Sequence, residues 1–575
     1  MPQLDKAATQ LEDWAKSNKT KPDHLTINSG IAPPFIDSSL TVGRYGPIVL
    51  TDHFLTETLQ HFNRERAPER VVHAKGAGAF GYFQVTHDIT KLSVAKVFES
   101  IGKKTPVVVR FSQVASDLGS PDTVRDPRGF AIKFYTEEGN WDLVGNNTPI
   151  FFMRDPILFP MFIHSQKRNP QTNMRDWNMF WDYLSSFSRP ESVHQVMFLF
   201  SDRGIPDGHR HMHGYSSHTF SLIGPNRKLT WVKFVWKTDG GIKNLDPEKA
   251  TQIAGVDPDY AVRDLFDSIE DAKKNGNYPS WTFYIQTMTP EEAKQQKFNP
   301  FDITKVWPHS KFPLQPVGKL VLNRNPANYF SDIEQLALNP SNMVPGVGAS
   351  PDRLLQGRLF AYRDTQYYRI GPNYEQLPVN RPMNRVANFE RDGQCVIQNQ
   401  GSAPNYHPNS FGGPDAQINI KEKTVPPQEV NGSIDYYDLG DEDNFSQPRH
   451  FWTKVLDAGA RTRMVDNLVA TIKLVSEDSV RQRAIDVFSN VEKKSKQLKS
   501  SKCKLSNNDA SKRLIRHVFW TKMETTFKDC RNKGRVYNCS LFEANRFMKD
   551  DGCIHYLVGN INVNIMSDNC DVANT

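Results

Sequence analysis

The chain has 575 residues, of which 38% are hydrophobic and 11% aromatic, with a formal net charge of +7. This length suffices for one large domain with additions or for several domains. The charge is small for so large a surface, and no Lys/Arg stripe is interleaved with aromatic residues, so we expect no nucleic-acid binding. No run of about 18 apolar residues and no signal-peptide core occurs, so we expect neither a membrane span nor a secretory signal.

Residues 1–65 are predicted to form an N-terminal arm, because residues 29–53 are rich in Gly, Pro and Ser, although residues 54–66 have the pattern of a helix. From 66 to 320, apolar and polar residues alternate in several segments and helical segments such as 173–187 interrupt them. The alternating segments are 105–116, 128–147, 214–224 and 228–241. Period-two alternation between turn signals indicates antiparallel strands. These residues therefore predict an α+β fold with an antiparallel β-barrel core.

The remaining sequence divides into three parts. Residues 321–440 hold many Pro, Asn and Gly and are predicted to form an extended wrapping segment. Residues 441–497 have helical spacing and predict a C-terminal helical domain. Residues 498–575 contain five of the six cysteines but no C-x-x-C pair, and this tail remains of unknown structure. With Cys395 as its one cysteine, the main body suits a reducing compartment.

The segment GAGAFG, residues 76–81, satisfies the G-x-G-x-x-G pattern of nucleotide-binding proteins. That fingerprint must follow a strand and open a helix. Here the glycines run directly into the strand-like YFQVTHDIT. We therefore exclude a Rossmann site.

A dense group of Arg and Tyr lies in residues 357–373, GRLFAYRDTQYYRIGPN. On a helix, Arg358 and Tyr362 would share one face. A guanidinium beside a phenol favours the phenolate, which is a hard anionic ligand suited to ferric iron. The alternative, an amphipathic helix with a solvated Arg and a half-buried Tyr, stays open on these residues alone.

Two other short segments contain chemically useful residues. His73 follows two valines and precedes small residues, where a satisfied core histidine is the alternative. Asn146 precedes an aromatic-rich run that includes Phe151, Phe152 and Phe159, and it has the alternative of an ordinary turn residue.

Taken together, these segments resemble the monofunctional haem catalases of the small-subunit, NADPH-binding type, from about residue 22 to about 497. FNRERAPERVVHAKGAGAFGYF resembles the active-site signature of that family, and RLFAYRDTQ resembles its haem-ligand signature. The resemblance implies haem-dependent disproportionation of hydrogen peroxide to water and dioxygen. Two alternatives are a catalytically impaired relative that binds haem or NADPH, and a catalase-related enzyme for lipid hydroperoxides, which is typically shorter.

The resemblance also implies a role for each matching residue. Tyr362 would be the axial ligand of the iron of haem (iron protoporphyrin IX), with Arg358 favouring its phenolate. His73 would be the acid and base, and Asn146 would orient the peroxide. The other positions that match haem contacts are Arg70, Val72, Arg110, Ser112, Phe151, Phe152, Phe159 and Arg369.

A surface NADPH site is implied in the same way. Its matching positions are His194, Ser201, Arg203, His213, Tyr215, Lys237, Trp307 and His309. His213 departs from the family, which commonly has Asn there. If residues 209–213 form a strand, His209, His211 and His213 would share one face, a pattern that also suits a metal. Since His209 and His211 lie in a family-typical stretch, we favour the interpretation without a metal.

The resemblance further implies a homotetramer that acts on hydrogen peroxide. A peroxisomal location follows from the family, although the chain ends in Ala573-Asn574-Thr575 and not in an S-K-L signal. The cytoplasm is therefore the alternative location.

Overall fold

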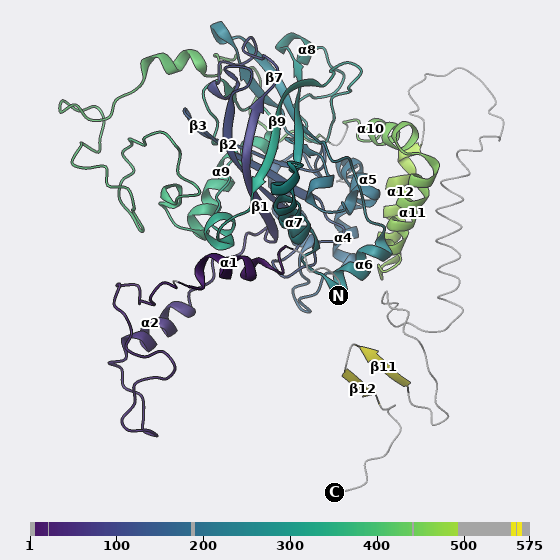
Figure 1. The fold of residues 1–575 in the computed structure, drawn as a ribbon. Helices are drawn as coiled ribbons and strands as arrows, with labels where there is room; N and C mark the ends of the chain where they lie inside the picture. Colours follow the sequence, from purple (N-terminus) through teal and green to yellow (C-terminus); the bar gives the residue numbers. More distant parts are fainter. Residues whose placement is uncertain are drawn as a thin grey trace, which may run out of the picture. The chain divides into compact units, whose positions relative to one another are not determined.

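The computed structural model describes residues 6–20, 22–185, 190–439 and 442–492, together with two short strands near the C-terminus (Figure 1). The chain divides into two units, Met1–Asn507 and Asn508–Thr575. In the second unit, β11 (Ile554–Val558) and β12 (Ile561–Ile565) pair as an antiparallel hairpin. The remainder of the predicted 498–575 tail lies outside the described residues.

The first unit is built on a closed barrel of antiparallel strands. Neighbouring strands pair in the order β10-β6-β7-β5-β4-β3-β2-β1-β9-β8, and an additional pairing of β7 with β8 closes the ring. The predicted α+β fold with an antiparallel β-barrel is therefore confirmed. The strands are β1 (Gly76–Val85), β2 (Lys104–Gln113), β3 (Arg128–Thr136), β4 (Gly139–Asn146), β5 (Gly214–Tyr215), β6 (Phe220–Ile223), β7 (Leu229–Thr238), β8 (Ser280–Met288), β9 (Gln315–Arg324) and β10 (Val347–Gly348).

Alternation along the strands separates an inner from an outer face. On β2, Val107, Val109 and Phe111 belong to the large apolar core inside the barrel. Val108, between them, belongs instead to a second cluster with Ile333 on the outer face. Successive strand residues point to opposite faces, so Arg110 and Ser112 also lie on the outer face.

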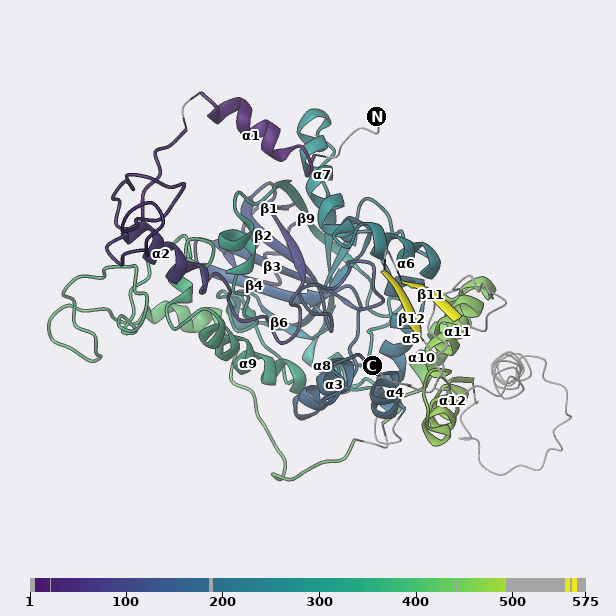
Figure 2. The same cartoon turned by 90° about the horizontal axis from the view of Figure 1, so that it is seen from below.

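Helices surround this barrel, and Figures 1 and 2 place α9 on one side of it and α10, α11 and α12 on another. None of the helices in the described ranges combines the length and apolar content needed to span a bilayer. The helices are α1 (Gln10–Asn18), α2 (His53–Phe62), α3 (Phe159–Gln166), α4 (Trp177–Leu184), α5 (Val193–Phe200), α6 (Pro247–Val256), α7 (Tyr260–Asn275), α8 (Pro290–Lys294), α9 (Arg353–Arg369), α10 (Ser446–His450), α11 (Ala458–Ile472) and α12 (Asp478–Glu492).

Several local predictions can be compared with these elements. The glycines of GAGAFG lie inside β1, so no helix opens there and the exclusion of a Rossmann site is confirmed. Residues 209–213 do not form the strand on which His209, His211 and His213 would share one face. His209–His211 form a short 3₁₀ helix, η5, directly after Gly208, whose φ of 79° turns the chain.

Candidate active site

A row of residues crosses the barrel wall from β1 to β4. Gly76 pairs with Ser112, Ser112 with Gly129, and Gly129 with Asn146. Directly opposed residues of antiparallel strands project to the same face of the sheet. Ser112 and Asn146 therefore project to the same face, with Gly129 between them.

His73 is held above this row, just before β1. Its Nδ1 lies 2.9 Å from the Ser112 hydroxyl oxygen, and its backbone N–H donates to the Val114 carbonyl at 3.0 Å. The backbone of His73 has a φ of 65°, in the left-handed region that side chains other than glycine rarely adopt. These two hydrogen bonds thus fix the ring and the backbone of His73.

Gly129 is necessary for this arrangement, although the sequence reasoning missed it. A Cβ at Gly129 would lie 2.3 Å from the Ser112 hydroxyl oxygen and 2.8 Å from Nδ1 of His73. Glycine inside a strand marks a close approach of another group. Applied to the glycine of the RGFAIKF strand, that rule could have predicted that another side chain approaches Gly129 closely.

The imidazole of His73 is uncharged at neutral pH. Burial, together with the positive charges of Arg110 and Arg358, lowers its pKa from the ordinary value to about 3. A neutral imidazole can accept a proton at one ring nitrogen while the other nitrogen is held by a hydrogen bond. His73 can therefore act as a base.

Helix α9 contributes the second half of the site. The Arg358 guanidinium donates to the Tyr362 oxygen at 2.8 Å and to the Val144 carbonyl on β4 at 3.1 Å. Tyr362 packs against the outer-face cluster that contains Val108 and Val144. Since the charge of Arg358 also acts on His73, one guanidinium connects the two halves of the site.

The start of α9 is fixed by a buried hydrogen-bonded Asp–His pair that sequence reasoning missed. Asp352 accepts a hydrogen bond from the Leu355 N–H at 3.1 Å and so caps the helix. Its other oxygen lies 2.8 Å from Nδ1 of His218, and both side chains are fully buried. His218 comes from the barrel side of the chain, so this pair joins α9 to the barrel, and no local sequence signal indicates it.

Three arginines expected near haem, Arg70, Arg110 and Arg369, form a buried cationic group. Arg70 and Arg369 both contact Glu334, at 3.1 and 3.4 Å, and Arg110 donates to the backbone carbonyls of His73 and Ala74. Burial lowers the pKa of all three guanidinium groups, to about 10 for Arg369.

The three arginines carry more positive charge than the single carboxylate of Glu334 balances. Within the described residues, the buried Nε atoms of Arg110 and Arg369 have no hydrogen-bond partner. Buried charges are expected to be paired, so the group suits a ligand that carries two further anions. The two propionates of haem meet that requirement, and the Tyr362 oxygen is a suitable iron ligand. The residues therefore fit haem.

Aromatic side chains lie next to α9. The rings of Phe151 and Phe159 stack with centroids 6.3 Å apart, and Phe151 contacts Phe152 at 5.5 Å. A Cβ on Gly357 of α9 would lie 2.5 Å from Pro156, so this segment packs closely on the helix. Val72, beside His73, is half-buried. These positions provide an apolar wall.

The positions expected to bind NADPH largely gather at the barrel side near β5 and β7. The positive charge of Arg203 acts on the buried phenol of Tyr215, and the Lys237 ammonium lies 5.8 Å from the centre of the same ring. His213 also contacts that ring, at 6.3 Å between centroids. The charge of Lys237 lowers the pKa of His309, after burial as the larger cause.

The three other expected positions differ in their surroundings. His194 is buried on α5, and within the described residues its Nδ1 has no partner. Ser201 accepts a hydrogen bond from the Arg203 N–H at 3.3 Å. Trp307 is only 1% exposed inside an apolar cluster with Phe312, so its ring offers no face to a ligand.

The three histidines of residues 209–213 do not form a metal site. His209 stacks on Phe111 at 5.1 Å, Nδ1 of His211 lies 2.9 Å from the Gly241 carbonyl, and His213 contacts Thr238. No group of His, Cys, Asp or Glu suited to a metal occurs in the part of the chain that the structure describes.

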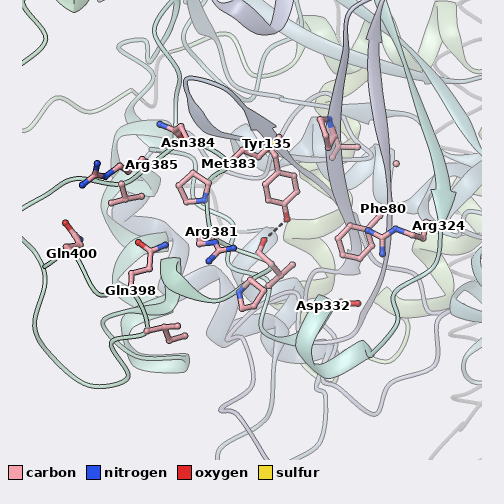
Figure 3. Close-up of a pocket in the computed structure, with 18 of the residues that line it drawn as sticks. Phe80, Tyr135, Arg324, Asp332, Arg381, Met383, Asn384, Arg385, Gln398 and Gln400 are labelled. Atoms are coloured by element: carbon pink, nitrogen blue, oxygen red, sulfur yellow. Dashed lines mark hydrogen bonds between the residues drawn. The ribbon is translucent and has the colours of Figure 1, made fainter. Parts of the chain in front are cut away.

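A separate cavity of about 1040 Å³ lies on the outer side of the barrel, and Figure 3 shows side chains that line it. Arg324, Arg381, Arg385 and Asp332 line it, and the Tyr135 hydroxyl donates to the Val379 carbonyl at 2.6 Å at its wall. None of the residues expected to contact haem or NADPH lines this cavity.

Comparison with known proteins identifies the family of the chain. A family model described as Catalase matches residues 26–413, and one described as Catalase-related immune-responsive matches residues 439–495. A catalase from Rattus norvegicus is 57% identical over 492 residues, covering 85% of this chain and 91% of that protein. A catalase from Ascaris suum is 53% identical over 534 residues, covering 92% and 96%.

Solved structures of catalases are also similar to this chain. A fungal catalase has a TM-score of 0.80 at 43% identity, covering 88% of this chain and 97% of that one. Catalase A from Saccharomyces cerevisiae has a TM-score of 0.78 at 47% identity, covering 81% and 96%. Together with the β-barrel, His73 beside its wall and Tyr362 on α9, these matches show that the chain belongs to the catalase family.

Proposed function

We propose that this chain disproportionates hydrogen peroxide to water and dioxygen, using haem bound between the outer wall of the barrel and α9. The observation that supports this most directly is the position of Arg358. Its guanidinium donates to the Tyr362 oxygen, and its charge acts on the imidazole of His73. A ligand oxygen and a neutral base thus belong to one site.

Haem would be held by the Tyr362 oxygen on the iron and by Arg70, Arg110 and Arg369 on the propionates. When bound, haem supplies the ferric iron at which the peroxide O–O bond is broken and at which a second peroxide is oxidised. Arg358 stabilises negative charge on the Tyr362 oxygen, because a hydrogen bond from a charged donor to an anion is strong.

His73 moves the proton. With Nδ1 held by Ser112, Nε2 accepts a proton from one peroxide oxygen and returns it to the other, which lets that oxygen leave as water. The side-chain amide of Asn146 donates a hydrogen bond that orients the peroxide. The phenylalanines beside α9 narrow access to small substrates.

Three further features extend the proposal. NADPH binds beside Arg203, His213 and Lys237, as in the small-subunit type. Subunits associate as a homotetramer, which is supported by exposed apolar side chains in the arm, among them Val42, Tyr45 and Leu50. The peroxisome is the proposed location, with the cytoplasm as the alternative.

The test is to purify the protein, record its visible spectrum and follow oxygen release from hydrogen peroxide. A Soret band with rapid oxygen evolution is expected. Protein that stays colourless and inactive after haem supplementation would refute the proposal. A Soret band without oxygen evolution would instead favour the catalytically impaired relative.

A further inference from the structure

Two arginines of α9, one on each side of Tyr362 in the sequence, are both linked to the barrel. Arg358 donates directly to the Val144 carbonyl on β4 at 3.1 Å. Arg363 donates instead to the side-chain oxygen of Asn342 at 3.3 Å. Asn342 lies in the segment between β9 and β10. The link from Arg363 therefore reaches the barrel only if Asn342 is itself held there.

Asn342 is held against Asp142 of β4 by two hydrogen bonds. Its side-chain N–H donates to the Asp142 carboxylate at 3.0 Å, and the Asp142 backbone N–H donates to the Asn342 carbonyl at 2.9 Å. The Lys133 ammonium donates to both oxygens of the same carboxylate, and both side chains are at most 1% exposed. Loss of one partner from such a buried pair is costly, so Asp142 is a fixed point of the barrel wall. Arg363 is thus tied to β4 through Asn342.

The two links hold α9 from different sides. At 3.6 residues per turn, side chains five residues apart point in directions about 140° apart around the helix axis. Arg358 alone would therefore leave the middle of the helix free to roll about one line of contact. A functional group keeps its working geometry only within about 10–20°. The direction of the Tyr362 side chain consequently depends on both arginines.

The other contact of Arg363 is on the surface. Its guanidinium lies 3.5 Å from the Glu375 carboxylate, and the two side chains are 36% and 46% exposed. Exposed ion pairs contribute little, because water and salt screen them. The hydrogen bond to Asn342 is therefore the contact through which Arg363 can act on the site.

We propose that Arg363 is a positioning residue for the iron ligand. Through Asn342 it holds α9 against Asp142, so that the Tyr362 oxygen keeps one direction toward the haem site. This inference rests on the proposed haem-dependent function. Arg358 supplies both charge and position to the Tyr362 oxygen, whereas Arg363 supplies position only.

The test compares the holoenzymes of the wild type, Arg363→Met, Asn342→Ala and the double variant. Methionine keeps an unbranched side chain of similar length but has no donor. The electron paramagnetic resonance spectrum of ferric haem reports the direction of the axial ligand through its rhombic splitting. We expect Arg363→Met to change this splitting and to release haem to apomyoglobin about three- to tenfold faster, the usual worth of one hydrogen bond. In the Asn342→Ala background, Arg363→Met should have no further effect, because the bridge is already lost.

Glu375→Gln is the matched control, since it removes the surface ion pair of Arg363 and keeps the bridge. Its spectrum and haem release should equal those of the wild type. A wild-type spectrum for Arg363→Met would overturn the inference, even if its urea midpoint fell, because the role would then be structural only. Equal effects of Arg363→Met with and without Asn342 would also overturn it. If the wild type itself retains no haem, the proposed function fails and the inference fails with it.

Discussion

The guanidinium of Arg358 donates a hydrogen bond of 2.8 Å to the Tyr362 oxygen, one turn along α9, and the same nitrogen donates to the Val144 carbonyl on the barrel. A single side chain thus places its positive charge beside the oxygen of the proposed iron ligand and holds α9 against β4. Both effects depend on the planar, multiply donating shape of Arg.

Arg358→Gln should therefore lower haem affinity or turnover by about 10- to 100-fold, the usual cost of losing a partner of a metal ligand. The haem-to-protein ratio after dialysis and the oxygen release per haem measure these effects. Arg353→Gln is the matched control, since Arg353 is on the same helix but forms only a long surface ion pair with Asp155 at 3.6 Å. Equal haem retention by the two variants would contradict the role of Arg358.

Tyr362→Phe removes one oxygen and leaves the ring packed on the outer-face cluster. We expect the variant to fold but to lose its Soret band on dialysis, with haem affinity at least about 100-fold weaker, since the ligand itself is lost. Tyr368→Phe is the control, because Tyr368 is on the same helix and 77% exposed. Stable haem and full activity in Tyr362→Phe would show that the ligand assignment is wrong.

Gly129→Ala tests the close approach on the barrel wall. The new Cβ would collide with the Ser112 hydroxyl and with Nδ1 of His73, so the ring must move. We expect oxygen release per haem to fall at least about tenfold, because displacement by about 1 Å can cost 100-fold in rate. Gly255→Ala on α6 meets nothing within 4 Å and should leave activity unchanged. Normal activity of Gly129→Ala would show that His73 needs no fixed position.

His73→Gln should lower turnover by about 10²- to 10⁴-fold, the usual contribution of a general acid–base group. The wild-type pH profile follows from the pKa of about 3 for His73. The neutral ring is the active base, and it becomes protonated only as the pH falls through about 3. Turnover should thus show no loss from His73 between pH 8 and 5. An acid limb at the ordinary histidine pKa that His73→Gln abolishes would contradict this.

Acid sensitivity of the fold depends on the buried histidines. The pKa of His209 is lowered to about 3 by burial, so the ring is neutral in the folded state and takes up a proton on unfolding below about pH 6.5. Its contribution to stability is complete above that value and is lost as the pH falls toward 3. For one such group, the free energy of unfolding falls by about 1.4 kcal/mol for each pH unit of acidification within this range.

His209→Phe should therefore unfold with a shallower pH dependence between pH 6.5 and 4.5. Both ring nitrogens of His209 are buried without a partner in the described residues, and the ring stacks on Phe111. Removing such nitrogens should leave stability at pH 7 equal or higher. Urea midpoints at several pH values measure this. An unchanged pH dependence would show that His209 is charged or partnered.

The alternation of apolar residues was sufficient to predict the barrel, because period-two patterns report the two faces of a strand directly. The same approach failed at His209–His211, where alternating histidines suggested a strand but Gly208 turns the chain into a 3₁₀ helix. A local turn there outweighs the pattern, and the three rings point to separate partners.

The site was predicted only through the resemblance. Spacing on one helix could suggest Arg358 with Tyr362, since both residues are local. Glu334 among the arginines, and Asp352 with His218, join residues that are far apart in the chain. Such contacts exist only after the barrel and α9 have packed, so no local pattern encodes them.

The left-handed backbone of His73 has an energetic consequence. A glycine would adopt this φ without the strain that an imidazole-bearing residue accepts, typically of order 1–3 kcal/mol. Selection on thermodynamic robustness alone would consequently favour a substitution that destroys the acid–base group. Position 73 holds a histidine although its backbone conformation favours glycine. This is expected where the chemistry of a site and the stability of the fold make opposing demands on one residue.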